Sequence, residues 1–551
     1  MISLGCAKNL VDAEIMLGNL MKDGFEITNE AEEADVMIVN TCSFIDSAQE
    51  ESVDTILESA EVREASNRGQ GLIVSGCLTQ RYREELPKLI PEVDVFMGID
   101  QVNQIGQKVR EALSHRSRRL AGEAELEKQG LSREEISEIL NGGSDEDEDE
   151  PTDHEKSESI RGTDSFGKTK VVVDPSMIVA PEIDVTQRPN YIPDFVTPRF
   201  RLTPRHFAYV KIAEGCNHPC SFCVIPRMRG SHRSRQQADI VQEAKALIAD
   251  GVKELNLISQ DSTYYGMDLR ENHKRTISSP EKFTAAAEAL PENATTLSSL
   301  LRELNAIEGD FWIRLLYTHP AHWTDELIQT IAECPKVARY VDMPLQHIHQ
   351  TMLERMRRET TQQYIVDLIA RIRKGIPGIA IRTTFIVGFP GETEDYFNTL
   401  LDFIRDTRFE RMGIFTYSHE EGTKAANMAQ QLTDEEKEAM KEKAMKVQLQ
   451  ISREQAAAQV GTTMKVLVEK EASETDLVEA SVQSWEHGHM RKELDLTEVP
   501  QEGYMVCRGE VDAPDIDGRV YVKGALAPGE FIQVKVVGHT DYDLIAEPVD
   551  Q

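Results

Sequence analysis

The stretch Ala213-Glu214-Gly215-Cys216-Asn217-His218-Pro219-Cys220-Ser221-Phe222-Cys223 holds three cysteines with the spacing C-x3-C-x2-C. Three thiolates hold three corners of an iron–sulfur cube, which normally takes four protein thiolates. The fourth iron would keep a free coordination position, as catalytic metal sites do. A structural zinc site is the alternative, with His218 as a further ligand, but this spacing fits a zinc ribbon poorly. The stretch therefore favours a cluster that takes part in chemistry.

Phe222, directly before the last cysteine, completes a pattern that resembles the radical S-adenosylmethionine (SAM) superfamily. The resemblance implies that the amino and carboxylate groups of SAM chelate the open iron. From His206 to about Tyr417, apolar segments alternate with helical patterns, which predicts a partial parallel (β/α)6 barrel with its site at the carboxyl ends of the strands. The expected strands are 208–213, 254–259, 311–317, 340–343, 380–387 and 411–417, and the expected helices include 238–249, 324–332, 361–374 and 394–406.

Several residues of this barrel are candidate SAM contacts. Gly388 and Pro390 end a strand in a run whose glycines permit close backbone approach to a ligand, although the run could also be only a tight turn. Polar residues follow two other strands, and two arginines lie inside strands, where burial without a functional partner would be unfavourable. These candidates are Gln260, Asp261, Gln346, Arg314 and Arg382.

The first 119 residues predict a doubly wound parallel-sheet domain, with short Val- and Ile-rich strands at 34–39, 71–75 and 93–97. A helix is expected between Leu10 and Gly24. Cys6, Cys42 and Cys77 each follow a strand, and the carboxyl ends of parallel strands share one edge. We therefore expect a second three-thiolate cluster, although each cysteine alone would be interpreted as a small buried hydrophobe. Because the chain begins so close to Cys6, we expect the natural start to lie upstream.

The remaining segments divide into linkers and a terminal domain. Residues 120–204 change in composition and include six consecutive acids at 145–150, typical of a disordered insertion before a Pro-rich linker. Further insertions are expected at 268–295 and 473–503. A long charged helix is predicted at 434–460. Strands at 464–468, 519–522 and 531–537 then predict a small antiparallel β-barrel over 463–551.

Charge and composition limit the class of partner. The 551 residues carry a formal net charge of −34, and residues 463–551 hold 8 Lys plus Arg against 19 Asp plus Glu. This disfavours a partner held through its phosphates and favours a basic one. No apolar run long enough to span a membrane and no signal peptide are visible, so we expect a cytoplasmic protein that does not bind membranes.

Taken together, the motifs resemble the radical SAM methylthiotransferases. The resemblance covers Leu4-Gly5-Cys6-Ala7-Lys8-Asn9, Asn40-Thr41-Cys42-Ser43-Phe44-Ile45, Gly76-Cys77-Leu78-Thr79-Gln80, the Cys216–Cys223 stretch with its continuation to Gly230, and Asp512–Gly518 with Tyr542–Ile545 in a TRAM-like terminal domain. It implies a methylthiotransferase domain at 1–119, an insertion and linker at 120–204, a radical SAM domain at 205–432, a connecting helix at 433–462 and the TRAM-like domain at 463–551.

The resemblance also implies cofactors and a reaction. Two 4Fe-4S clusters are expected, one on Cys6, Cys42 and Cys77 and one on the catalytic Cys216, Cys220 and Cys223. One SAM would donate a methyl group to sulfur at the first cluster, and another would be cleaved at the second to a 5′-deoxyadenosyl radical. That radical would take hydrogen from an unactivated carbon, which an acid or base cannot readily do. An external electron donor is required, and the sulfur source is unknown.

Details of the motifs point to one branch of the family. Lys8-Asn9, Ser43-Phe44-Ile45 and the acidic terminal domain resemble the enzymes that methylthiolate the β-carbon of an aspartate in the twelfth small-subunit ribosomal protein, which is basic. Sister enzymes modify tRNA adenosines, and this is the main alternative. A non-catalytic iron–sulfur redox or RNA-binding protein is an alternative of another class, and it predicts no SAM cleavage.

Overall fold

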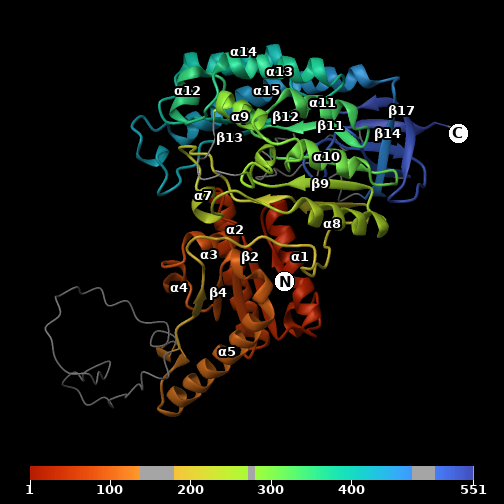
Figure 1. Ribbon diagram of the computed structural model, residues 1–551. Helices are drawn as coiled ribbons and strands as arrows, with labels where there is room; N and C mark the ends of the chain where they lie inside the picture. Colours follow the sequence, from red (N-terminus) through yellow and green to blue (C-terminus); the bar gives the residue numbers. More distant parts are fainter. Residues whose placement is uncertain (134, 137–178, 271–278, 474–502, 550–551) are drawn as a thin grey trace. The chain divides into compact units, whose positions relative to one another are not determined.

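The computed structural model describes residues 1–133, 135–136, 179–270, 279–473 and 503–549 (Figure 1). The chain forms two compact units, one of Met1–Pro189 with Thr197–Phe200 and one of Asn190–Val196 with Arg201–Gln551. The acidic run at 145–150 and nearly all of the expected insertion at 473–503 lie outside the described residues. Among the described helices, none has the length and apolar character needed to span a bilayer.

The first unit is built on a parallel sheet whose described strands lie in chain order, β1 to β5. Asn40 and Thr41 at the end of β2 align with Ser75 and Gly76 at the end of β3, so both strands reach the same edge together. The strands are β1 (Ile2–Ser3), β2 (Val36–Thr41), β3 (Gly71–Gly76), β4 (Val95–Met97) and β5 (Glu182–Asp184), and the helices are α1 (Ala7–Lys22), α2 (Asp46–Ser66), α3 (Cys77–Arg81), α4 (Leu86–Leu89) and α5 (Ile105–Lys128), with short 3-10 turns at Ala31–Glu33 and Ile99–Gln104.

Helices cover both faces of this sheet, which confirms the expected α/β class. Leu72 and Val74 of β3 share a buried cluster with Ile56 of α2. On the opposite face, Gly71 lies against Ala112 of α5, where a Cβ atom would come within 3.2 Å of the alanine Cβ. The strands follow the chain without the reversal of order that marks many doubly wound sheets.

The segment predicted as a linker at 120–204 contributes ordered elements to the first unit. Helix α5 continues to Lys128, and β5 pairs in parallel with β4 at the sheet edge. Lys108 of α5 binds Asp184 of β5 at 2.8 Å, and the ring of His115 contacts the Ala180 carbonyl at 2.9 Å. β5 has only three residues, too few for a periodic pattern to reveal it.

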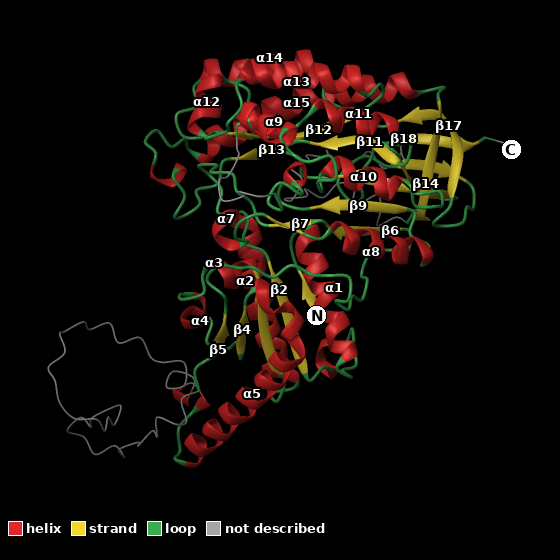
Figure 2. Cartoon of the chain, in the orientation of Figure 1, coloured by secondary structure: helices red, strands yellow, loops and turns green. Residues whose placement is uncertain are grey.

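The second unit contains the predicted partial (β/α)6 barrel. Its described strands form a six-stranded sheet in the order β13-β12-β11-β10-β9-β6, with parallel pairing throughout (Figure 2). The strands are β6 (Phe207–Lys211), β9 (Glu254–Ile258), β10 (Trp312–Leu315), β11 (Val337–Asp342), β12 (Ala380–Val387) and β13 (Arg411–Thr416), and the short β7 (Ala213–Glu214) and β8 (Arg233–Ser234) pair beside them.

Helices pack on the outer face of this sheet. Leu368 and Ile372 of α13 and Leu400 and Ile404 of α14 belong to the same buried core as alternate strand residues such as Ile381. The helices are α7 (Ile225–Met228), α8 (Gln237–Ala249), α9 (Pro280–Glu288), α10 (Leu297–Asn305), α11 (Asp325–Glu333), α12 (Gln350–Arg355), α13 (Gln362–Gly375), α14 (Glu394–Thr407) and α15 (Asp434–Gln459), with short turns at Ser262–Tyr264, Pro320–His322 and Ala425–Asn427. α15 begins with a capping box between Thr433 and Glu436.

A small closed barrel follows α15, as predicted. Its described strands run in the order β14-β15-β16-β18-β17, and they pair antiparallel except for β16 with β18. They are β14 (Thr463–Glu471), β15 (Tyr504–Gly509), β16 (Val520–Lys523), β17 (Phe531–His539) and β18 (Leu544–Pro548). Val466, Val520 and Val534 are among the residues that fill its interior.

Candidate active site

Cys6, Cys42 and Cys77 lie where β1, β2 and β3 end. Cys6 precedes α1, Cys42 directly follows β2, and Cys77 is the first residue of α3. Gly5, at φ +85°, is packed so closely on Cys42 that an added Cβ atom would lie 2.9 Å from the cysteine Sγ. The thiol of Cys77 lies 3.6 Å from the side-chain oxygen of Asn9 on α1. The fold thus places all three cysteines at the same edge of the sheet.

The loop that carries Cys216, Cys220 and Cys223 is fastened to other parts of the second unit. The backbone N–H of Ser221 donates to the Met356 carbonyl at 3.0 Å, and its hydroxyl donates to the Arg355 carbonyl at 2.8 Å. Gly215 has φ +84°, and a Cβ atom there would meet the Ser231 carbonyl oxygen at 2.2 Å, so only glycine fits. The loop is therefore held in one shape from both sides.

Burial controls the protonation of these thiols. It raises the pKa of Cys216 well above its usual value, and the charge of Asp261 adds to that effect. Burial also raises the pKa of Cys223 to about 12, with Cys220 contributing. At neutral pH both thiols are protonated when metal-free, so iron binding must displace their protons.

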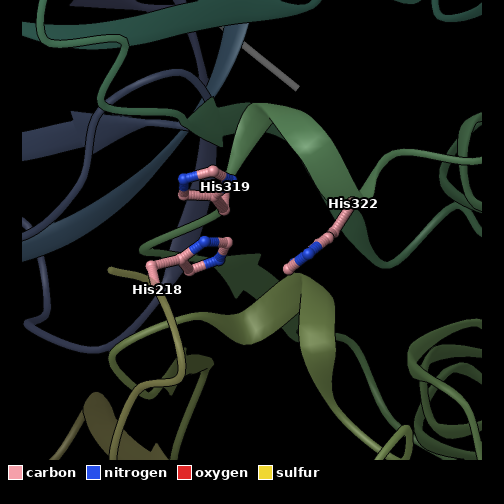
Figure 3. Close-up of side chains that lie close together, drawn as sticks. All are labelled: His218, His319 and His322. Atoms are coloured by element: carbon pink, nitrogen blue, oxygen red, sulfur yellow. The ribbon is translucent and has the colours of Figure 1, made fainter. Parts of the chain in front are cut away.

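A buried group of histidines joins His218 of the cysteine loop to two histidines of the loop after β10 (Figure 3). The rings of His218 and His319 stack with centroids 3.6 Å apart, and His322 lies next to them. Asp261 contacts His218 Nε2 at 2.9 Å and His322 Nδ1 at 2.7 Å through one carboxylate oxygen. The hydroxyl of Thr263 donates to the other oxygen at 2.7 Å. The group links the loop to the ends of β9 and β10.

These contacts set the charges in the group. Burial alone would lower the pKa of His218, but the contacts with the carboxylates of Asp261 and Glu359 together outweigh it and raise that pKa to about 9. Burial lowers the pKa of His319 well below its usual value, and the Arg358 charge adds to this. A cationic ring therefore stacks on a neutral one. The nitrogens of His218, His319 and His322 lie within 4.8 Å of one another, but stacked rings direct their lone pairs along nearly parallel planes, which suits hydrogen bonding better than one shared metal ion.

The predicted SAM loop after β12 has a buried carboxylate at its centre. Glu392 accepts hydrogen bonds from the backbone N–H groups of Gly388 at 2.7 Å and Phe389 at 3.3 Å. Its other oxygen contacts His347 Nε2 at 3.0 Å. Gly388 has φ +71°, and the carbonyl of Pro390 accepts a hydrogen bond from Arg355 at 3.0 Å. Glu392 was not predicted as a site residue, because a glutamate near a helix start looks like an ordinary first-turn residue.

The two predicted glutamines also lie at the carboxyl ends of strands. Gln260 follows β9 and donates to Glu214 at 2.5 Å. Gln346 follows β11, bridges to Phe385 of β12 and has φ +71°. Among the described residues, three of the six non-glycine residues with positive φ are Tyr317, Gln346 and Arg357, which lie in loops after β10 and β11. Such backbone strain concentrates at functional sites.

Arg314 and Arg382 have partners elsewhere. Arg314 pairs with Glu254 of β9 at 2.6 Å and donates to the Glu510 carbonyl of the terminal barrel at 2.7 Å. Arg382 lies 3.3 Å from Asp342 and 3.5 Å from Asp517 of the terminal barrel. The contacts of these arginines are thus with acidic residues and backbone of the barrels, and not with the cysteine loop.

The residues around the cysteine loop fit an iron–sulfur cluster. All six cysteines are free thiols. Among the described residues, the buried Nε2 of His319 and Nε of Arg358, both close to the loop, lack hydrogen-bond partners. Unpaired buried polar atoms are rare in folded proteins and are common where a bound group is to be received.

Comparisons with known proteins agree with this architecture. Residues 1–98 match the uncharacterized protein family UPF0004, residues 210–404 match the radical SAM superfamily, and residues 494–549 match the TRAM domain. The chain is 48% identical to the ribosomal protein uS12 methylthiotransferase RimO of Opitutus terrae, over 100% of this chain and 96% of the relative. It is 44% identical to the RimO of Akkermansia muciniphila, over 99% of each chain.

The chain belongs to the RimO family of radical SAM methylthiotransferases. A RimO from Geobacter sulfurreducens is 39% identical over 99% of this chain and 97% of its own. Among solved structures, the radical SAM methyltransferase TsrM from Kitasatospora setae aligns with a TM-score of 0.42 at 16% identity, over 74% of this chain and 70% of that one. The predicted enzyme class and the predicted family are confirmed.

The motifs predicted no role for Asn9, His319 or His322. Asn9 lies one turn after Cys6 and contacts Cys77, and the expected motif already contained it without giving it a role. His319 and His322 belong to the loop after β10, from which no site residue was predicted. The signal that could have found them is the pairing of a histidine inside the cysteine loop with an acid after the neighbouring strand.

Proposed function

We propose that this enzyme transfers a methylthio group to the β-carbon of an aspartate in ribosomal protein uS12. The observation that carries the proposal is the presence of two separate cysteine triads. One is spread over the ends of the parallel strands β1, β2 and β3, and the other lies within the single loop that follows β6 and the short β7. Relatives that match this chain over nearly its whole length are named ribosomal protein uS12 methylthiotransferases. The net charge of −34 suits a basic protein substrate better than a nucleic acid.

In this proposal, Cys216, Cys220 and Cys223 hold one 4Fe-4S cluster, and Cys6, Cys42 and Cys77 hold the other. When bound, the clusters and SAM supply the electron and the radical that remove hydrogen from an unactivated carbon. Gly388 and Pro390 shape the SAM site, and Glu392 fixes their loop through two backbone hydrogen bonds. Gln260 and Gln346 extend this site, while Asp261 orients the cysteine loop through His218.

The same proposal assigns the segments. Residues 1–119, with β5, form the methylthiotransferase domain, 205–432 the radical SAM domain, 433–462 a connecting helix and 463–551 the TRAM domain. Residues 120–204 otherwise connect the first two. The protein is proposed to work in the cytoplasm with an external electron donor.

The test uses anaerobically reconstituted full-length protein, a reductant, SAM, and a uS12 peptide that carries the target aspartate, with tRNA in a parallel reaction. We expect a methylthio mass increase on the peptide and none on tRNA, read by mass spectrometry. If only tRNA were modified, the substrate would be tRNA instead of uS12, and the methylthio transfer itself would still be supported. If no 5′-deoxyadenosine formed, the proposed cleavage of SAM by this protein would be contradicted.

Cysteine variants test the assignment of the two clusters. Cys216→Ala is expected to abolish SAM cleavage and to lower bound iron by roughly half, since each cube contributes equally. Cys77→Ala is expected to lower iron by a similar share while SAM cleavage persists. Cys334→Ala, at a buried free thiol after α11, is the matched control and should retain all of the iron.

A further inference from the structure

The chain after α12 turns sharply and places Arg358 against the cysteine loop. Arg357 has φ +56°, a left-handed conformation that non-glycine residues adopt at an energetic cost. The turn is closed by hydrogen bonds from the Arg357 N–H to the Glu354 carbonyl at 3.0 Å and from the Arg358 N–H to the Leu353 carbonyl at 2.8 Å. The strained backbone fixes the direction in which the Arg358 side chain points.

The guanidinium of Arg358 contacts a thiol of the proposed radical cluster. Its Nη1 lies 3.6 Å from the Sγ of Cys220, and its Nη2 donates to the Pro344 carbonyl at 2.8 Å. Arg358 is 8% exposed, so water screens its charge weakly. The Pro344 carbonyl, in the loop after β11, holds the guanidinium in place. The position of the guanidinium relative to Cys220 is therefore fixed.

The other cysteine triad has the opposite kind of neighbour. The side-chain amide of Asn9 donates hydrogen bonds to the Leu4 carbonyl at 3.1 Å and to the Thr41 carbonyl at 2.7 Å. This fixes the amide so that its oxygen, 3.6 Å away, faces the sulfur of Cys77. An oxygen atom cannot donate a hydrogen bond to a thiolate. The two triads therefore offer different electrostatic surroundings to the clusters they would hold.

We propose that Arg358 is a positioning residue that makes the cluster on Cys216, Cys220 and Cys223 easier to reduce, through its N–H contact with Cys220. Reduction adds one electron to the cluster, and a buried cation at a ligand sulfur stabilises the more negative state. Hydrogen bonds to sulfur and net charge are among the main determinants of iron–sulfur potentials. This inference rests on the proposed function, because it takes Cys220 as a cluster ligand.

The test is a redox titration of the full-length protein with both clusters, followed by electron paramagnetic resonance. The radical cluster is recognised by the change of its signal on addition of SAM. In Arg358→Gln we expect the equilibrium constant for its one-electron reduction to fall about tenfold, which corresponds to about 59 mV. Arg358→Lys should fall less, because it keeps the charge. The second cluster serves as an internal reference and should not change.

Arg357→Gln is the matched control. It removes the same charge from the neighbouring position, keeps a non-glycine residue at the same φ, and acts at an exposed side chain where solvent screens the effect. We expect no change in either potential. Arg358→Met is the second neutral variant, should Arg358→Gln bind little iron.

Two results would overturn the inference. One is an unchanged potential in a neutral Arg358 variant that holds its full iron content. The other is loss of the radical cluster from both neutral variants, because Arg358 would then be needed to hold the cluster rather than to tune it. Absence of that cluster from the unmodified protein would instead contradict the proposed function.

Discussion

Single residues determine how closely the cysteines can approach one another. Gly5 precedes Cys6 and lies against Cys42, where an added Cβ atom would stand 2.7 Å from the Cys42 Cβ. Arg357 and Gly215 show the same principle in the second unit, where special backbone angles serve the geometry of the cysteine loop. At this scale, the site depends on residues that carry no chemistry of their own.

Gly5→Ala should therefore remove iron from the first unit alone. The new methyl group displaces Cys42, so bound iron falls by roughly half while SAM cleavage persists. Gly24→Ala is the control, because Gly24 has nearly the same φ, +86° against +85°, and no described atom lies within 4 Å of its added Cβ. Both variants bear a similar backbone penalty, of about 1 kcal/mol. Full iron content in Gly5→Ala, measured chemically, would contradict the prediction.

Loops at the ends of strands are the elements on which SAM binding depends. In Glu392→Ala, the loop after β12 loses its acceptor for two backbone N–H groups and its contact with His347. We expect the Kd for SAM to rise about tenfold, a loss of about 1.4 kcal/mol. Equilibrium dialysis with labelled SAM measures this. Glu394→Ala, at an exposed position two residues later, should bind SAM normally, and equal affinity in both variants would refute the role of Glu392.

The elements themselves were largely predictable, and their side-chain partners were not. Strands such as β3 are marked by Val and Ile between turn residues, and Cys77 directly after one is visible in the sequence. The contact of Arg358 with Cys220 joins positions 138 residues apart, and no local pattern encodes it. Arg314 was noticed as a buried charge, but its acid partner Glu254 lies on another strand, which only the fold reveals.

Across the whole second unit, buried charges join the radical SAM barrel to the TRAM barrel. Arg508 pairs with Glu254 at 2.5 Å and with Glu469 at 2.7 Å. Tyr340 donates to Asp517 at 2.7 Å. Because these groups are buried, removal of one partner leaves the other uncompensated. These contacts therefore fix the TRAM barrel in one orientation against the strands of the radical SAM barrel.

Glu469→Gln should destabilise this attachment in a pH-dependent way. Burial alone would raise the pKa of Glu469, but Arg508 and His206 outweigh it and lower the pKa from 4.5 to about 2. The ionised glutamate therefore stabilises the fold fully above pH 4.5, and this contribution is lost as the pH falls toward 2. We expect the variant to lose about 3 kcal/mol at pH 7, and the deficit to shrink on acidification.

Urea unfolding from pH 7 to pH 3 measures the deficit. Glu471→Gln, at an exposed position of the same strand, is the control and should follow the unmodified protein throughout. A deficit for Glu469→Gln that stays constant over this range would argue against the ion pair.

The short edge strand β5 changes how the first unit should be regarded. Helix α5 and β5 are tied together by Lys108 with Asp184 and by His115 with Ala180, although the chain leaves α5 at Lys128 and returns only before Glu182. The domain is thus completed by contacts between segments that lie before Lys128 and from Ala180 onward in the chain. A single cut between Lys128 and Glu182 would divide the polypeptide, yet the contacts of α5 with β5 would still join its two parts.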